Sequence, residues 1–137
     1  MPAYSFQLQF CEPVETGRKT HTIRGKRKHR PKPGQTFYGY YAMRTKQCRK
    51  LVQSPITRVQ DIVIEDSGRR FQQVMPIVRD MRVFGIYPRM IVDGEVLADD
   101  EMDCLAVRDG FRSLWDMMAF WDGRLPFNGD IIHWRKP

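Results

Sequence analysis

Two residues near the start of the chain, Lys19 and Thr22, are of types that can act on a carbonyl or a phosphate. They lie in the octapeptide Gly-Arg-Lys-Thr-His-Thr-Ile-Arg, which spans Gly17 to Arg24. Hydrolysis of an amide requires a base or nucleophile, a hydrogen-bond donor for the developing oxyanion and an acid for the leaving nitrogen. Lys19 could be the base if the neighbouring cations lowered its pKa, and Thr22 could donate to the oxyanion or position water.

The same two residues also have a simpler interpretation. Lys19 would contact a phosphate, and Thr22 would be an ordinary residue of a β-strand. On residue chemistry alone this simpler interpretation is favoured, because short motifs are hypotheses until their geometry is known.

The segments around the octapeptide predict two strands and a helix. Tyr4 to Phe10 alternates between apolar and polar residues, which is typical of a half-buried strand. Pro13 fits the first turn of a short helix over about Glu12 to Thr16, which Gly17 ends. Thr20 to Arg24 is rich in β-branched residues and predicts a second strand. We therefore expect the octapeptide to lead into a strand.

The remainder of the chain predicts further strands, then helices. Strands are expected at Gln35–Ala42, at Leu51–Gln53 and at Ile56–Ile64, with Pro55 separating the last two. An Asp-Ser-Gly turn is expected in Glu65–Arg70, and a strand at Met81–Tyr87 ends the mixed region that begins at Phe71. A hairpin is expected at Met90–Leu97, and a closing strand at Asp130–Trp134. Helices are expected over Asp99–Val107 and after a capping Ser113. Without repeats or regular βαβ alternation, residues 1–137 predict a single α+β domain with a small barrel-like sheet.

Charge is unevenly distributed along the sequence. The chain has 23 Lys and Arg residues and 16 Asp and Glu residues, but 13 of the basic residues and no acidic residue fall between Thr16 and Gln60. A solvated surface normally mixes both signs, because like charges repel. This segregation predicts an anionic partner, of which a nucleic-acid backbone is the commonest.

The basic window supplies the candidate nucleic-acid contacts. Phosphate contacts would give affinity and salt dependence without sequence preference, whereas aromatic side chains could stack unpaired bases. We expect His21 and one or two of Tyr38, Tyr40 and Tyr41 to be available for stacking. The full set of candidate contacts is Arg18, Arg24, Lys26, Arg27, Lys28, Arg44, Arg49, Lys50 and Tyr41.

Several other classes of protein are disfavoured by the sequence. The longest apolar run, Met117 to Trp121, is far shorter than the roughly 20 residues that cross a bilayer, and the first residues do not resemble a signal peptide. The three widely spaced cysteines, Cys11, Cys48 and Cys104, predict reduced thiols in a cytoplasmic compartment. The histidines show no metal-ligand spacing, so neither a metal nor a cofactor is expected. The oligomeric state is left open.

Five landmarks together resemble the ASCH domain family, which has a PUA-like fold. They are Gly17-x-Lys19-x-x-Thr22-x-Arg24, Gly34 at the start of a strand, Arg44-Thr45 after it, Asp109-Gly110-Phe111 before an apolar helix, and Ile131-Ile132-His133-Trp134. The resemblance covers almost the whole chain and implies a compact barrel of about six strands flanked by short helices. It also implies a cleft beside the first motif. Residues 62–90 have no counterpart in the shortest members and are expected to be an elaboration.

The resemblance also implies a function. Members of the family are regarded as RNA-binding modules, one bacterial branch hydrolyses the acetyl amide of acetylcytidine nucleosides, and ribonuclease activity has been proposed. The working residues of the amidohydrolase branch are a Lys, a Thr and a Glu. Lys19 and Thr22 match the first two, whereas Asp109 occupies the third place with a side chain one methylene shorter. On its own residue type, Asp109 would be a turn residue before Gly110.

The sequence therefore predicts an RNA-binding domain with a nucleotide-sized cleft. Its ligand would be single-stranded nucleic acid or a modified nucleoside. The alternative is a hydrolase in the same cleft, either an acetylcytidine amidohydrolase or a ribonuclease, with Lys19, Thr22 and Asp109 as catalytic residues. An adaptor that uses its basic face to bind an acidic protein is the least supported interpretation.

Overall fold

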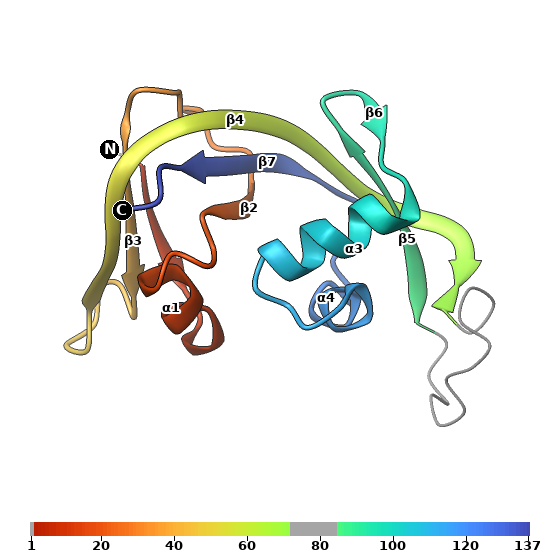
Figure 1. The fold of residues 1–137 in the computed structure, drawn as a ribbon, viewed down its shortest axis with the longest axis horizontal. Coiled ribbons are helices and arrows are strands. Elements are labelled where there is room, and N and C mark those ends of the chain that lie inside the picture. The colour runs from red at the N-terminus through yellow and green to blue at the C-terminus, as the bar shows by residue number, and fades with distance from the viewer. Residues whose placement is uncertain (1, 72–84) are drawn as a thin grey trace.

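The fold is organised around β4, a strand of 22 residues that spans Arg49–Arg70. The computed structural model describes residues 2–71 and 85–137. Figure 1 shows β4 as a long arch with the helices on its concave side. Its first part pairs with β3 (Thr36–Tyr41), its middle with β7 (Phe127–Trp134) and its last part with β5 (Ile86–Val92), all antiparallel. One strand thus connects the whole sheet.

The other strands extend this seven-stranded sheet at its margins. The short β1 (Ala3–Phe6) pairs in parallel with β3, β2 (His21–Gly25) pairs with β7, and β6 (Glu95–Val96) closes a hairpin with β5. The described residues also form three helices, α1 (Leu8–Glu15), α3 (Asp99–Arg108) and α4 (Leu114–Phe120). This architecture confirms the α+β class.

The sheet is open, so the expected closed barrel is wrong. Among the described residues, β1 pairs only with β3 and β2 only with β7. Where a barrel would close, Arg24 of β2 donates from Nη2 to the main-chain oxygen of Ser5 in β1 at 2.8 Å. A side chain, and not a ladder of backbone hydrogen bonds, therefore links these two strands.

The first strand is shorter than its alternating pattern predicted. β1 ends at Phe6, and α1 begins at Leu8, so the strand expected to reach Phe10 is wrong beyond Phe6. In the helix, Phe10, Cys11 and Val14 face the core while Leu8 is 69% exposed. Leu8 and Phe10 share one side of a strand but different sides of a helix, and the helix buries the larger aromatic residue.

Pro55 does not interrupt β4, which corrects the expectation of two separate strands. Proline lacks an N–H, but the neighbouring backbone bonds are made. Ile56 donates to Gln35 at 2.7 Å, and the Pro55 oxygen accepts from Arg135 at 3.0 Å. The turn expected in residues 65–70 is likewise an irregularity within β4, where the register with β5 shifts between Asp66 and Arg70.

The other expected elements agree with the structure within a few residues. β2, β3, the β5–β6 hairpin around Asp93-Gly94, α3 and β7 are all present. Ser113 caps α4 by accepting a hydrogen bond from the Asp116 N–H at 3.2 Å. The strand expected at 81–87 falls mostly outside the described residues, as does much of the expected elaboration at 62–90.

The core lies between the concave face of the sheet and the helices. Trp134 of β7 stacks on Phe37 of β3 with ring centroids 4.3 Å apart. The fully buried apolar side chains include Phe37, Ile62, Ile64, Met90, Met102, Leu114, Met117, Ile131 and Ile132. In the described ranges, no helix combines the length and apolar character that a membrane span requires.

Candidate functional site: a cleft between β2 and the end of α3

Lys19, Thr22, Arg24 and Asp109 line a single cleft, although Asp109 lies 90 positions after Lys19. The cleft has a volume of about 400 Å³. The rest of its wall is largely aromatic, formed by Phe6, Phe10, Phe111, Phe120, Trp121 and Phe127. The expected catalytic residues are thus brought together at one place, beside several aromatic rings.

Two turns place the ends of this cleft. Gly17, at φ +78°, ends the segment after α1, and the Lys19 N–H then donates to the Pro13 oxygen at 2.9 Å. Asp109 caps the end of α3, and Gly110 follows at φ +100°. A Cβ on Gly110 would lie 3.0 Å from the Phe10 ring and 3.5 Å from Lys19. Glycine therefore lets the Asp109 turn approach the Lys19 side chain.

Lys19 and Asp109 form a buried ion pair at the base of the cleft. Lys19 Nζ donates to Asp109 Oδ1 at 2.5 Å and to the Asp109 main-chain oxygen at 2.7 Å. Lys19 is 2% exposed and Asp109 is 6% exposed. The aspartate therefore reaches the lysine despite being one methylene shorter than glutamate.

The environment of this pair lowers both pKa values. Burial lowers the pKa of Lys19 below its usual range, and the attraction of Asp109 only partly offsets this effect. Burial would raise the pKa of Asp109, but the charge of Lys19 and the contact with His21 outweigh it and hold that pKa below the ordinary value. Asp109 is thus an ionised carboxylate, and Lys19 loses its proton more readily than a surface lysine.

Thr22 and Arg24 form a second polar pair in the same cleft. Arg24 Nε donates to Thr22 Oγ1 at 2.9 Å. The guanidinium also lies over the Phe6 ring, 4.8 Å from its centroid. Because the hydroxyl oxygen accepts this bond from a cation, its own proton is free to be donated to a ligand oxygen.

His21 lies next to the site, and the sequence did not predict it there. Its Nε2 lies 3.3 Å from Asp109 Oδ1, and the side chain is buried. His21 is therefore unavailable for stacking a base, which corrects that expectation. Lys19 lies before β2, which begins at His21, so no strand periodicity in the sequence linked these two side chains.

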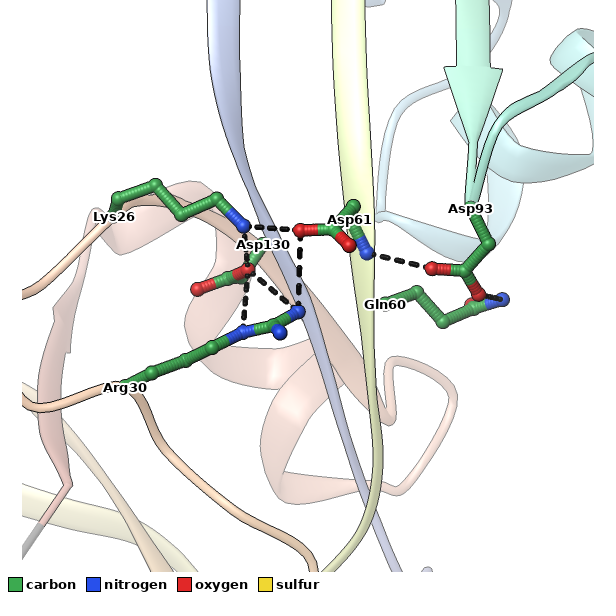
Figure 2. A network of polar contacts seen from close by, with 6 residues as sticks. All are labelled: Lys26, Arg30, Gln60, Asp61, Asp93 and Asp130. Atoms are coloured by element: carbon green, nitrogen blue, oxygen red, sulfur yellow. Dashed lines mark hydrogen bonds and ion pairs between the residues drawn. The ribbon is translucent and has the colours of Figure 1, made fainter.

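The basic loop after β2 is held by acidic residues from elsewhere in the chain (Figure 2). Lys26 Nζ contacts Asp130 Oδ1 at 2.6 Å and also pairs with Asp61. Arg30 Nε donates to the same Asp130 oxygen at 3.1 Å. Asp130 is 1% exposed, so two cations cover a buried carboxylate. Lys26 was expected to contact phosphate, and the structure gives it protein partners.

Several other expected nucleic-acid contacts also have partners within the protein. Arg18 pairs with Glu12, Arg49 with Glu15 at 2.6 Å, and Lys50 with Gln53 at 2.9 Å. Arg27 donates to the Ala3 oxygen at 2.9 Å and lies over the Tyr4 ring. Basic residues that are separated from acidic ones along the sequence are therefore often paired within the folded protein.

Lys28, Arg44 and Tyr41 differ from this group. Lys28 and Arg44 are exposed, and within the described ranges neither makes a hydrogen bond or an ion pair. Tyr41 is half-buried at the end of β3. These three residues are the part of the expected basic face that is free to meet a ligand.

The described part of the chain contains no group of three or more His, Cys, Asp or Glu side chains arranged to hold a metal ion. Cys11, Cys48 and Cys104 are all free thiols.

Comparisons with family models, with curated proteins and with solved structures found no match to this chain. The resemblance to the ASCH family therefore stays a prediction, and the function of the cleft has to be argued from its own geometry.

Proposed function

We propose that this protein binds a nucleoside-sized ligand in the cleft and hydrolyses an amide bond on it. The observation that carries the proposal is the convergence of Lys19, Thr22 and Asp109 on one cavity of about 400 Å³. This volume is within the usual range of about 300–1,000 Å³ for small-molecule sites. Six aromatic side chains in the wall, together with the polar groups that converge on it, suit a nucleobase.

The side chains suggest a division of roles in the reaction. In its deprotonated form, which the lowered pKa makes more accessible, Lys19 takes a proton from water, whose oxygen attacks the carbonyl carbon. The Thr22 hydroxyl, polarised by Arg24, donates to the oxyanion that forms. When the carbon–nitrogen bond breaks, the proton held by Lys19 passes to the leaving nitrogen. Asp109 holds the Lys19 amine in place and stabilises the ammonium form between these two transfers.

The acyl substrate is proposed from the resemblance to the acetylcytidine branch of the ASCH family. The chain departs from that branch by having Asp109 in place of Glu. The 2.5 Å contact between Asp109 and Lys19 supports the same pairing with the shorter residue.

Turnover of acetylcytidine tests this proposal. Wild-type protein should release acetate, and Lys19→Ala should abolish release while the protein stays folded. Lys46→Ala is a matched control, because Lys46 is exposed and outside the cleft. Equal rates for wild type and Lys19→Ala would contradict the role of Lys19.

A second candidate function is RNA binding by an ASCH-like domain of PUA-like type in the cytoplasm. The exposed cations Lys28 and Arg44 and the half-buried Tyr41 favour it. Affinity for single-stranded RNA should fall steeply from low to physiological salt, and Lys28→Gln should reduce the slope by about one. A flat salt response would contradict this function. Cleavage of the RNA in the same assay would indicate the ribonuclease alternative.

A further inference from the structure

A second groove lies on the other side of β2, between the sheet and α3. Its volume is about 610 Å³. Three of its residues form a row across adjacent strands, because His21 of β2 is in register with His133 of β7, and His133 with Arg58 of β4. Cross-strand partners project from the same face of a sheet. α3 forms the opposite wall and contributes Arg108 from its last turn.

Two guanidinium groups in this groove lack partners. Arg58 and Arg108 are exposed, and among residues 2–71 and 85–137 neither has a hydrogen-bond or ion-pair partner. Arg18 also lines the groove, but it pairs with Glu12. This contrasts with the basic loop of Figure 2, whose cations Lys26 and Arg30 are neutralised by carboxylates.

Acidic residues do not neutralise the two arginines. Asp100 and Glu101 of α3 line the same groove. The Glu101 carboxylate is engaged in accepting a hydrogen bond from the Ala98 N–H at 2.9 Å. Neither acid is within ion-pair distance of Arg58 or Arg108. Within the described residues, Arg58 and Arg108 therefore lack a carboxylate partner, although two acids share the groove with them.

A hydrogen-bond relay fixes the orientation of His133 in this groove. The Gln60 side chain donates from Nε2 to Asp93 Oδ2 at 3.1 Å, so its Oε1 is the atom that faces His133 Nε2 at 2.8 Å. His133 Nε2 must then carry the proton.

The charge around His133 keeps its ring neutral. Burial and the charges of His21, Arg58 and Arg108 lower the pKa of His133 to about 4, and the charge of Asp93 opposes them in part. The His133 ring is thus neutral and lies in the same groove as two unpaired cations. An anion bound there would reduce the repulsion between the two guanidinium groups.

We propose that this groove binds a phosphate group, held by the guanidinium groups of Arg58 and Arg108 beside His133. Guanidinium forks bind tetrahedral oxyanions through paired, charge-assisted hydrogen bonds. The phosphate belongs either to a free phosphorylated small molecule or to a nucleic-acid backbone. The site is separate from the cleft and does not depend on amide hydrolysis.

Histidine NMR signals of the full chain at pH 7 test this site directly. Inorganic phosphate, added at constant ionic strength against chloride, should shift the His133 ring signals saturably. Arg58→Gln and Arg108→Gln should each weaken binding by about tenfold, the loss expected for one charge-assisted contact. Arg112→Gln is the matched control, since Arg112 is exposed and lines neither cavity, and its affinity should equal that of wild type.

Two further ligands identify the source of the phosphate. A nucleoside monophosphate that binds more tightly than inorganic phosphate would indicate a small molecule. Displacement of inorganic phosphate by a single-stranded RNA oligomer would indicate a backbone phosphodiester. A His133 shift that does not saturate, or that the Arg58→Gln, Arg108→Gln double variant retains in full, would overturn the proposal. Arg58→Lys, which keeps the charge but loses the fork, should fall between wild type and Arg58→Gln.

Discussion

Replacing Asp109 with Asn would leave the ammonium of Lys19 buried without its counter-charge. The side chains of the pair are 3% and 8% exposed, so water cannot take over the lost contact. Removing one partner of a buried ion pair typically costs about 3–5 kcal/mol of folding free energy. The Asp109 main-chain oxygen, 2.7 Å from Lys19 Nζ, would remain as an acceptor. We therefore expect a loss of about 3 kcal/mol at pH 7, at the lower end of that range.

The loss should depend on pH with a definite sign. Burial lowers the pKa of Lys19 in the folded protein, and Asp109 partly offsets this effect. In Asp109→Asn the pKa should fall further, so that the folded chain loses the proton while the unfolded chain keeps it up to about pH 10.4. Where the unfolded state binds more protons, stability rises with pH. The penalty should accordingly shrink as the pH is raised from neutral toward 10.

Urea unfolding of both proteins at several pH values measures this difference. Asp99→Asn is the control, because the Asp99 pair with Arg69 is exposed and screened by water, so its loss should change stability little. Adding Lys19→Met to Asp109→Asn should recover most of the loss, since no charge is then buried alone. A loss below about 1 kcal/mol at neutral pH, or one that does not change with pH, would refute the buried-pair argument.

Three other changes test separate parts of the structure. Gly110→Ala should destabilise the protein by about 1–3 kcal/mol, because the residue has φ +100° and the added Cβ would lie 3.0 Å from Phe10; an unchanged melting midpoint would contradict this. Asp130→Ala should make the basic loop more sensitive to trypsin, because it removes the carboxylate shared by two cations of Figure 2; equal cleavage rates would show that the loop is held by other contacts. Because burial and neighbouring charges lower the pKa of His133 to about 4, stability should fall as the pH drops from about 6.5 toward 4, and His133→Gln should flatten that slope.

The elements that sequence predicted well are those with strong local signals. Ser113 caps α4, and the Asp93-Gly94 turn closes the β5–β6 hairpin. The errors occur where tertiary context overrides a local pattern. Pro55 was expected to end a strand, but β3 and the C-terminal segment supply its neighbours' hydrogen bonds, and β4 continues. The alternation through Phe10 resembled a strand, but burial of Phe10 in α1 is the stronger constraint.

The candidate site was predictable from the sequence only where its residues lie close together along the chain. The spacing of Lys19 and Thr22 is local, whereas the approach of Asp109 depends on the path of the whole chain. No sequence pattern indicated that Asp61 and Asp130 would neutralise Lys26 and Arg30, because those contacts join distant strands. The number of basic residues between Thr16 and Gln60 therefore overstated how much unpaired positive charge the folded protein presents.

Acetylcytidine hydrolysis in ¹⁸O-labelled water tests the central claim most directly. If Lys19 activates water in the cleft, wild-type protein should release cytidine and acetate in equal amounts, with the label in the acetate. Lys19→Ala should release neither product. Unchanged acetylcytidine after prolonged incubation with folded wild-type protein, or equal release by both proteins, would contradict the proposed hydrolysis of this substrate.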